Sequence, residues 1–218
     1  MRHAAMGLLK DIADIFRKDR KLFLYVNAYY FGLVLLGALI ALAFPGAQVF
    51  LINTAGNILG GGALDPFSVI GEVYRSGNVL EAAGVTFIYN LVLGTLVEIT
   101  IPSLVIPFWA PFIGAVRAVE WGIMLIIPVP GLLPLQRAVP HYLTIILEGE
   151  AYVVAIFACL RQAKVLLRLE SIPADRRIKE YLAAMADNLK LLPVVALLLA
   201  LSALYEAWEV MFFAGVIK

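Results

Sequence analysis

The sequence has few of the residues that soluble enzymes use for catalysis. Its 218 residues include one cysteine and two histidines, which excludes an intrachain disulfide, a cysteine-rich metal cluster and a zinc site made of three histidines. The HExxH pattern of zinc proteases and the GxSxG pattern of serine hydrolases are both missing. We therefore expect no metal and no cofactor, and an intramembrane enzyme is the weakest functional hypothesis.

Charged residues are also scarce. They make up 15% of the chain, whereas soluble domains have about 25%. The net charge of +1 gives no indication of a nucleic-acid partner. Hydrophobic residues instead make up 62% of the chain, and the mean hydropathy is +0.92. The composition predicts a multi-pass protein of the cell membrane, with residues 1–218 forming a single membrane domain in contact with the lipid bilayer.

Long apolar runs separated by prolines predict an all-α bundle of transmembrane helices. A helix needs about 20 apolar residues to cross the hydrocarbon core, which leaves room for about five spans. Proline removes a helix hydrogen bond, so residues 102–111, with three prolines, are expected to form a turn. The first run is too long for a signal peptide, and we interpret it as an uncleaved span. The predicted spans cover about 22–44, 83–101, 112–127, 140–160 and 191–213.

Three other segments are expected to lie at the membrane surface. Residues 7–21 have the spacing of an amphipathic helix in the membrane interface. Residues 47–60 are too short and too rich in glycine to cross the bilayer, which indicates a re-entrant or an interfacial segment. Residues 66–82 should form a short surface helix, because Asp65 and Pro66 resemble a helix cap followed by a proline at the first helical position.

The distribution of basic residues predicts the orientation. Lysine and arginine are concentrated before the first span and in the segment 161–190, whereas the 45–82 loop has only Arg75 and the 128–139 loop only Arg137. Because basic residues favour the cytoplasmic side, we expect a cytoplasmic N-terminus and an external C-terminus. The segment 161–190 is expected to be helical on both sides of Pro173. It either binds anionic lipid or a protein partner, or is simply a basic cytoplasmic loop.

Ionisable residues inside the spans are the candidate site, because a charge in hydrocarbon is costly unless it serves a purpose. Glu148 and His141 lie on one helical face, which continues as a stripe of small residues ending at Cys159. Small residues favour close helix packing, so Glu148 should face the bundle interior. It is either a proton or cation site with His141 as a relay, or a buried carboxyl group without that role. Glu150 points elsewhere and is a secondary candidate.

A second group of candidates lies nearer the cytoplasmic side. Arg117 and Glu120 are one helical turn apart. Glu98 lies about 22 Å into its span at 1.5 Å per residue, within reach of Arg117. The three are expected to form a structural clamp or an inner gate. Glu206 and Glu209, beside an interfacial tryptophan, are predicted to be interfacial anchors, and Glu206 is kept as a secondary candidate site residue.

Residues 80–160 show a resemblance to a known family. The stretches TFIYN, ending at Asn90, IPSL with the following run to Gly114, and PHYLTIILEGEAYVVAIFA are similar to segments of the stage II sporulation protein M family. The resemblance implies a protein of five or six spans with a cytoplasmic N-terminus. It marks Asn90 and His141, and either Glu148 or Glu150, as family positions. The best-described member is a membrane platform for partners in peptidoglycan remodelling.

Two functional hypotheses follow. The first is a scaffold or assembly factor for a membrane or cell-envelope complex, with partners at the segment 161–190 or the 45–82 loop. The alternative is a transporter or channel for protons, cations or a small solute, which would use Glu148 and His141 with Glu98 and Arg117. Self-association through the small-residue stripes fits either hypothesis.

Overall fold

The computed structural model describes residues 2–59 and 66–218, and this part of the chain is helical, without a β-sheet. The helices are α1 (Arg2–Lys18), α2 (Arg20–Ala43), α3 (Pro45–Leu59), α4 (Pro66–Ser76), α5 (Val79–Tyr89), α6 (Ile101–Ser103), α7 (Trp109–Trp121), α8 (Leu135–Leu166) and α9 (Ala174–Phe213). Two π-helices, η1 (Asn90–Thr100) and η2 (Gly122–Ile126), extend α5 and α7, and η3 (Leu169–Ser171) is a single turn. The predicted all-α fold is confirmed.

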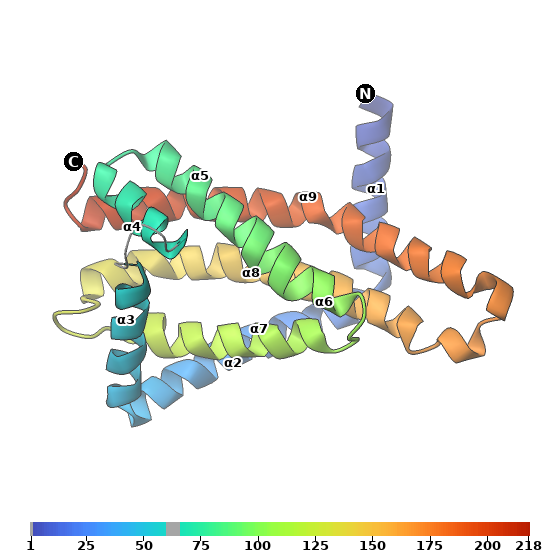
Figure 1. Ribbon diagram of the computed structural model, residues 1–218, viewed down its shortest axis with the longest axis horizontal. Helices are drawn as coiled ribbons and strands as arrows, with labels where there is room; N and C mark the ends of the chain where they lie inside the picture. Colours follow the sequence, from blue (N-terminus) through green and yellow to red (C-terminus); the bar gives the residue numbers. More distant parts are fainter. Residues whose placement is uncertain (1, 60–65) are drawn as a thin grey trace.

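Five helical segments of the described chain are long and apolar enough to cross a membrane, as predicted. They are Arg20–Ala43, Val79–Ser103, Trp109–Ile126, Leu135–Leu166 and Ala174–Phe213. α8 is the central helix, because 72% of its most apolar window is buried, against 22–33% for the other four. The long helices run along the long axis of the molecule (Figure 1). We call the end with residues 104–108 and 167–173 the basic end, and the opposite end, with residues 127–134, the far end.

The helices differ from the predicted spans where prolines lie within them. The second span continues through Pro102 to Ser103. Proline cannot donate to the Glu98 carbonyl one turn earlier, and the indole Nε1 of Trp109 donates to that oxygen instead, at 2.6 Å. α8 and α9 begin at Leu135 and Ala174, well before the predicted starts at 140 and 191. As predicted, the segment 161–190 is helical on both sides of Pro173.

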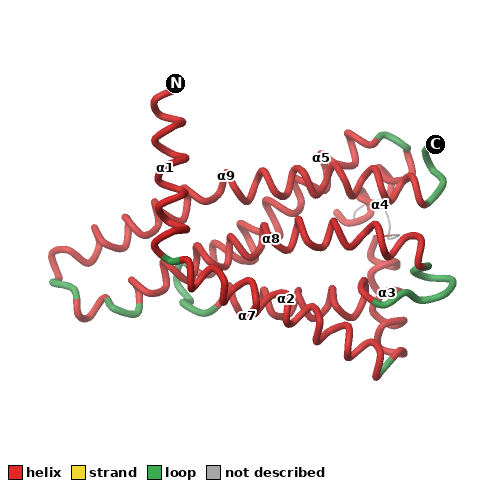
Figure 2. The backbone as a smooth tube through the Cα atoms, turned by 180° about the vertical axis from the view of Figure 1, so that it is seen from behind, coloured by secondary structure: helices red, strands yellow, loops and turns green. Residues whose placement is uncertain are grey.

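α1 and α3 lie at steep angles to the bundle (Figure 1 and Figure 2). α1 docks through its last turns, where the Phe16 ring stacks on Phe157 of α8 at 5.4 Å. α3 lies across the ends of α2 and η2 (Figure 1). It is fixed by Gln48, whose Nε2 donates to the Ile127 carbonyl at 2.6 Å. Residue 60 and Asp65 lie outside the described residues.

The segment 66–82 contains two helices, not the single helix predicted. Gly77 has a φ of +77°, which ends α4. Asn78 then caps α5 by accepting a hydrogen bond from the Glu81 backbone N–H at 3.2 Å.

Glycines bring α2 and η2 into direct backbone contact. A Cβ atom at Gly122 would lie 2.0 Å from the Val34 carbonyl oxygen, and one at Gly37 would lie 2.3 Å from the Val119 carbonyl oxygen. Only glycine permits this approach. The α2–η2 crossing is therefore tightly packed backbone.

Candidate functional site: a line of ionisable side chains

Glu148 lies at the centre of the bundle. Its side chain faces inward from α8 with 7% exposure, as its helical face predicts. Tyr152, one turn later on the same face, is also buried and donates its hydroxyl hydrogen to Glu148 Oε1 at 2.9 Å. The sequence reasoning missed Tyr152, although its spacing of four residues from Glu148 was a usable signal.

Toward the basic end, the line continues through Arg117 of α7. Its guanidinium group lies over the Tyr152 ring, 4.2 Å from the ring centre, and its Nη1 donates to the Gly94 carbonyl at 3.2 Å. Its Nη2 forms an ion pair with Glu98. Arg117 is 17% exposed and Glu98 is 47% exposed, so the ion pair connects the interior with the surroundings of the bundle. The predicted contact between Glu98 and Arg117 is present.

The π-helix η1 makes room for this contact. A Cβ atom at Gly94 would lie 2.9 Å from Tyr152 Oη and 3.3 Å from Arg117 Nη1, so only glycine fits without displacing both groups. π-helical turns often mark functional sites. Asn90 is the first residue of η1, and its carbonyl accepts a hydrogen bond from Thr95 Oγ1 at 3.0 Å. Asn90 thus shapes η1 through its backbone, and no hydrogen bond joins its side chain to the line within the described residues.

Toward the far end, His141 of α8 pairs with Glu209 of α9. The His141 Nδ1 and Glu209 Oε1 atoms are 2.5 Å apart. Glu209 is 1% exposed, so its prediction as an interfacial anchor is wrong. The reason is the close packing of α9 on α8, where Ser202 Oγ donates to the Thr144 carbonyl at 3.3 Å. Glu209 lies two turns after the buried Ser202, a spacing that could have revealed its position.

Glu206 of α9 is partly buried and lies three positions before Glu209. It is near enough to Glu148 and His141 for its charge to act on both, but no hydrogen bond or ion pair joins it to either within the described residues. Glu148 and His141 are separated by about 10 Å along α8, at 1.5 Å per residue. They are therefore too far apart for a direct hydrogen bond.

Two buried hydroxyl groups beside Glu148 have no hydrogen-bond partner within the described residues. Thr144 lies one turn before Glu148 on α8. Tyr30 comes from α2, and its ring approaches Gly149, the residue after Glu148, so that a Cβ atom there would lie 3.2 Å from it. Buried polar atoms are normally paired, and unpaired ones call for an explanation. These two hydroxyls are free to bind a group that arrives at Glu148.

A pocket of about 200 Å³ gives access to the line from the far end. His141 and Glu209 line it together with Arg137 and apolar residues such as Leu133. Arg137 Nε donates to the Phe213 carbonyl at 3.4 Å at the end of α9. A solute in this pocket can therefore reach Arg137 and the His141–Glu209 pair.

Two predicted candidates lie outside the line. Glu150 points toward α2, where Asn27 Nδ2 donates to its Oε2 at 3.5 Å, so it lies on a different face from Glu148. Glu120 is exposed and forms no ion pair with Arg117 in the described part of the chain, because Arg117 is directed at η1 and Tyr152. The predicted cluster of three is thus reduced to Glu98 and Arg117.

Across residues 2–59 and 66–218, there is no group of three or more histidine, cysteine, aspartate or glutamate side chains placed to hold a metal ion. What the line does contain is carboxyl, phenol and imidazole groups, which donate and accept protons. No protein family, curated protein or solved structure matches the chain.

Proposed function

We propose that the protein is a membrane transporter that carries protons along the line from the far-end pocket to Glu98. The observation that carries the proposal is the position of Glu148, which is buried at the centre of the bundle and hydrogen-bonded to Tyr152. A carboxyl group in hydrocarbon is costly, and such groups commonly belong to proton or ion pathways. Helix packing alone would be served by apolar residues.

The order of the groups supports a stepwise path. His141 and Glu209 line the far-end pocket, and Glu206 is the carboxyl group that would connect them with Glu148. From Glu148 the hydrogen bond of Tyr152 leads toward the basic end. Each of these side chains can release a proton and accept another.

Arg117 is the point of control on this path. A guanidinium group has no acceptor and does not lose its proton, so it cannot act as a relay. Its positive charge stands between Glu148 and Glu98, and a fixed positive charge is a known barrier to protons and cations in pores. For a proton to pass, Arg117 would have to move away from the Tyr152 ring. Because its ion pair with Glu98 holds it there, this ion pair is the gate of the proposed path.

The test is proton flux in proteoliposomes loaded with a pH-sensitive dye, with a pH gradient and a potassium diffusion potential. Glu148→Gln should reduce flux at least tenfold, because glutamine has no ionisable proton. Glu150→Gln is the matched control, since it makes the same change two residues away on a face outside the line, and it should retain flux. Native protein that conducts no better than empty liposomes, or equal flux in both variants, would overturn the proposal.

A scaffold is the second candidate function, and a surface feature favours it. An apolar groove of about 490 Å³ runs along the start of α9, where Ile178 and Leu182 are exposed beside Val105. A partner helix would bury these residues. Membership of the stage II sporulation protein M family, whose best-described member is such a platform, stays a prediction. Crosslinking that captures a partner through the segment 161–190, lost on charge reversal there and unaffected by Glu148→Gln, would support this function.

A further inference from the structure

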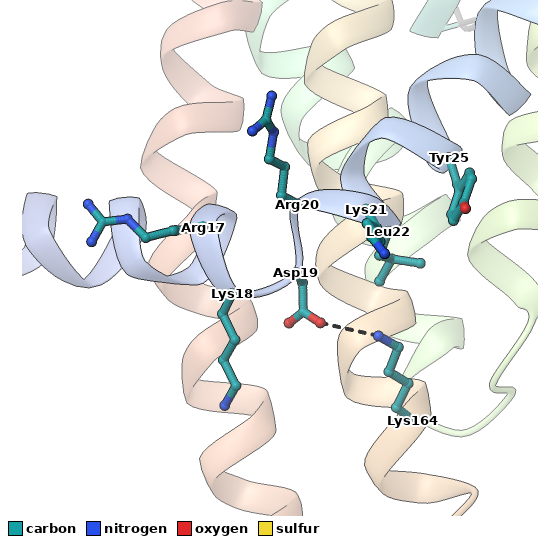
Figure 3. Close-up of a pocket in the computed structure, with 8 residues that line it drawn as sticks. All are labelled: Arg17, Lys18, Asp19, Arg20, Lys21, Leu22, Tyr25 and Lys164. Carbon is teal, nitrogen blue, oxygen red and sulfur yellow. Dashed lines mark hydrogen bonds and ion pairs between the residues drawn. The ribbon is translucent and has the colours of Figure 1, made fainter.

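A basic pocket lies where α1 meets α2 beside the end of α8. It has a volume of about 560 Å³. Figure 3 shows its lining, in which basic side chains surround a single carboxylate. The residues are Arg17, Lys18, Asp19, Arg20, Lys21, Leu22, Tyr25 and Lys164. The pocket is remote from the Glu148 line, and neither functional proposal makes use of it.

The one carboxylate of the pocket is already engaged. Asp19 accepts a hydrogen bond from Arg161 Nε at 2.8 Å and another from Lys164 Nζ at 3.2 Å. Burial by itself raises the pKa of Asp19, but these two cations outweigh it and hold the pKa below its usual value of 3.8. Asp19 therefore stays ionised and committed to these two partners.

Three other cations of the pocket have no such partner, whereas Arg17 pairs with Asp14 of α1. Lys18, Arg20 and Lys21 are exposed and take part in no ion pair within the described residues. In Figure 3 the Arg20 side chain points away from Asp19. Asp19 makes no side-chain capping bond to α2, so the positive end of this helix also faces the pocket. The pocket thus presents an excess of positive charge that the protein itself does not neutralise.

The remaining lining indicates where the pocket lies relative to the membrane. Leu22 and Tyr25 belong to the first turns of a helix that is apolar enough to cross the bilayer, and Tyr25 is exposed. Tyrosine is enriched at the boundary between headgroups and hydrocarbon. α1 leaves this point at a steep angle to the bundle (Figure 1). The cations therefore lie at the level of lipid phosphates, with an apolar helix surface directly below them.

We propose that this pocket binds the phosphate of an anionic lipid. Arg20, Lys21 and Lys18 would contact the phosphate oxygens, and the acyl chains would run along Leu22, Tyr25 and the exposed Leu24. A soluble phosphate would gain the charge contacts alone. The lipid would also secure α1 at the joint, because it would bridge the end of α1 and the start of α2.

The test is lipid binding to the full chain in detergent, followed by native mass spectrometry and by melting temperature. Phosphatidylglycerol should bind and raise the melting temperature, and phosphatidylcholine should do neither. Arg20→Gln with Lys21→Gln should weaken phosphatidylglycerol binding roughly 30-fold, since a surface cation contributes about fivefold. Arg176→Gln with Lys179→Gln is the matched control, because it removes two exposed cations at the same end of the molecule, and it should bind normally.

Each other outcome overturns the proposal in a specific way. Equal losses of phosphatidylglycerol binding in the two double variants would show that the lipid is attracted to the basic end in general and has no specific site in the pocket. Equal binding of both lipids would exclude a role for headgroup charge. If millimolar inorganic phosphate or glycerol 3-phosphate raised the melting temperature of the native chain as much as phosphatidylglycerol does, that result would assign the pocket to a free phosphate. Circular dichroism checks that Arg20→Gln with Lys21→Gln folds, and Lys21→Gln alone provides a milder second variant.

Discussion

Ion pairs at the basic end and in the bundle interior both join carboxylates to cationic groups, but in different surroundings. At the basic end, Asp19 and Asp187 are 23% and 38% exposed, and both pair with Arg161, which is 13% exposed. His141 and Glu209 form a single contact from which water is nearly excluded. A surface pair contributes about 0–1 kcal/mol, whereas removing one partner of a buried pair costs about 3–5 kcal/mol. The interior pair is thus the one on which the fold depends, although it has fewer contacts.

α8 carries both kinds of site and keeps them apart. Arg161 lies near its end, and Glu148 lies near its middle. Between them, Phe157 is fully buried against Phe16 and Phe23, with ring centres 5.4 and 5.5 Å away. This aromatic cluster separates the interior line from the charged network. A disturbance of one site should therefore have little effect on the other.

The largest effect is expected from removing one partner of the interior pair. Glu209→Ala leaves His141 buried without its partner and should lower the free energy of unfolding by about 3–5 kcal/mol. The measurement is unfolding of the purified chain in mixed micelles by increasing amounts of SDS. Glu209→Gln is the control, because its amide oxygen can still accept from the imidazole, and it should cost less.

The double variant sharpens this prediction. His141→Phe combined with Glu209→Leu replaces the pair by apolar side chains and should recover most of the lost stability. If Glu209→Ala instead unfolds like the native chain, water reaches the pair, and the contrast between the two regions disappears.

A smaller effect is expected at Gly94, where the interior line is packed against η1. In Gly94→Ala, the new methyl group would lie 2.9 Å from Tyr152 Oη, so either Tyr152 or η1 must shift, at a cost of about 1–3 kcal/mol. The displaced phenol would no longer donate to Glu148, and proton flux should fall as well. Both are measured in the assays above.

Gly84→Ala provides the control for that variant. Gly84 lies on α5, in the same span, and a Cβ atom there meets no other atom within 4 Å. This change should stabilise the helix by about 0.5–1 kcal/mol. Equal effects of the two alanines would mean that Gly94 is not in close contact with the line.

The parts of the site that could be predicted from the sequence are those that depend on a single helix. The inward direction of Glu148 follows from the helical period, and the reach of Glu98 to Arg117 follows from counting the rise per residue. The five spans follow from composition. Each of these inferences uses distances along one helix or between neighbouring spans, which the sequence specifies directly.

The parts that could not be predicted depend on contacts between distant helices. Glu209 meets His141 across 68 positions of sequence, and its depth depends on how closely α9 packs on α8. The π-helix at 90–100 has no local signal, because it depends on the fit of Gly94 against Tyr152 and Arg117. Glu120 was expected to pair because it lies one turn from Arg117, but Arg117 has better partners on other helices.

The smallest effect is expected at the basic end. Asp19→Asn should lower the free energy of unfolding by about 1 kcal/mol or less, because the Asp19 and Lys164 side chains stay 23% and 49% exposed. The pKa of Asp19 is below 3.8 in the folded chain, so its contribution is fully present above that pH and is lost as the pH falls through the lower, folded value. The native chain should therefore lose its small advantage over Asp19→Asn as the pH is lowered below about 4, as measured by melting temperature. Asp14→Asn removes a carboxylate from α1 whose one ion pair in the described part of the chain is with the exposed Arg17, and it should have no effect at any pH. A loss in Asp19→Asn that exceeds that in Glu209→Ala would reverse the comparison, since the stability of the bundle would then depend on its charged surface and the interior pair would be dispensable.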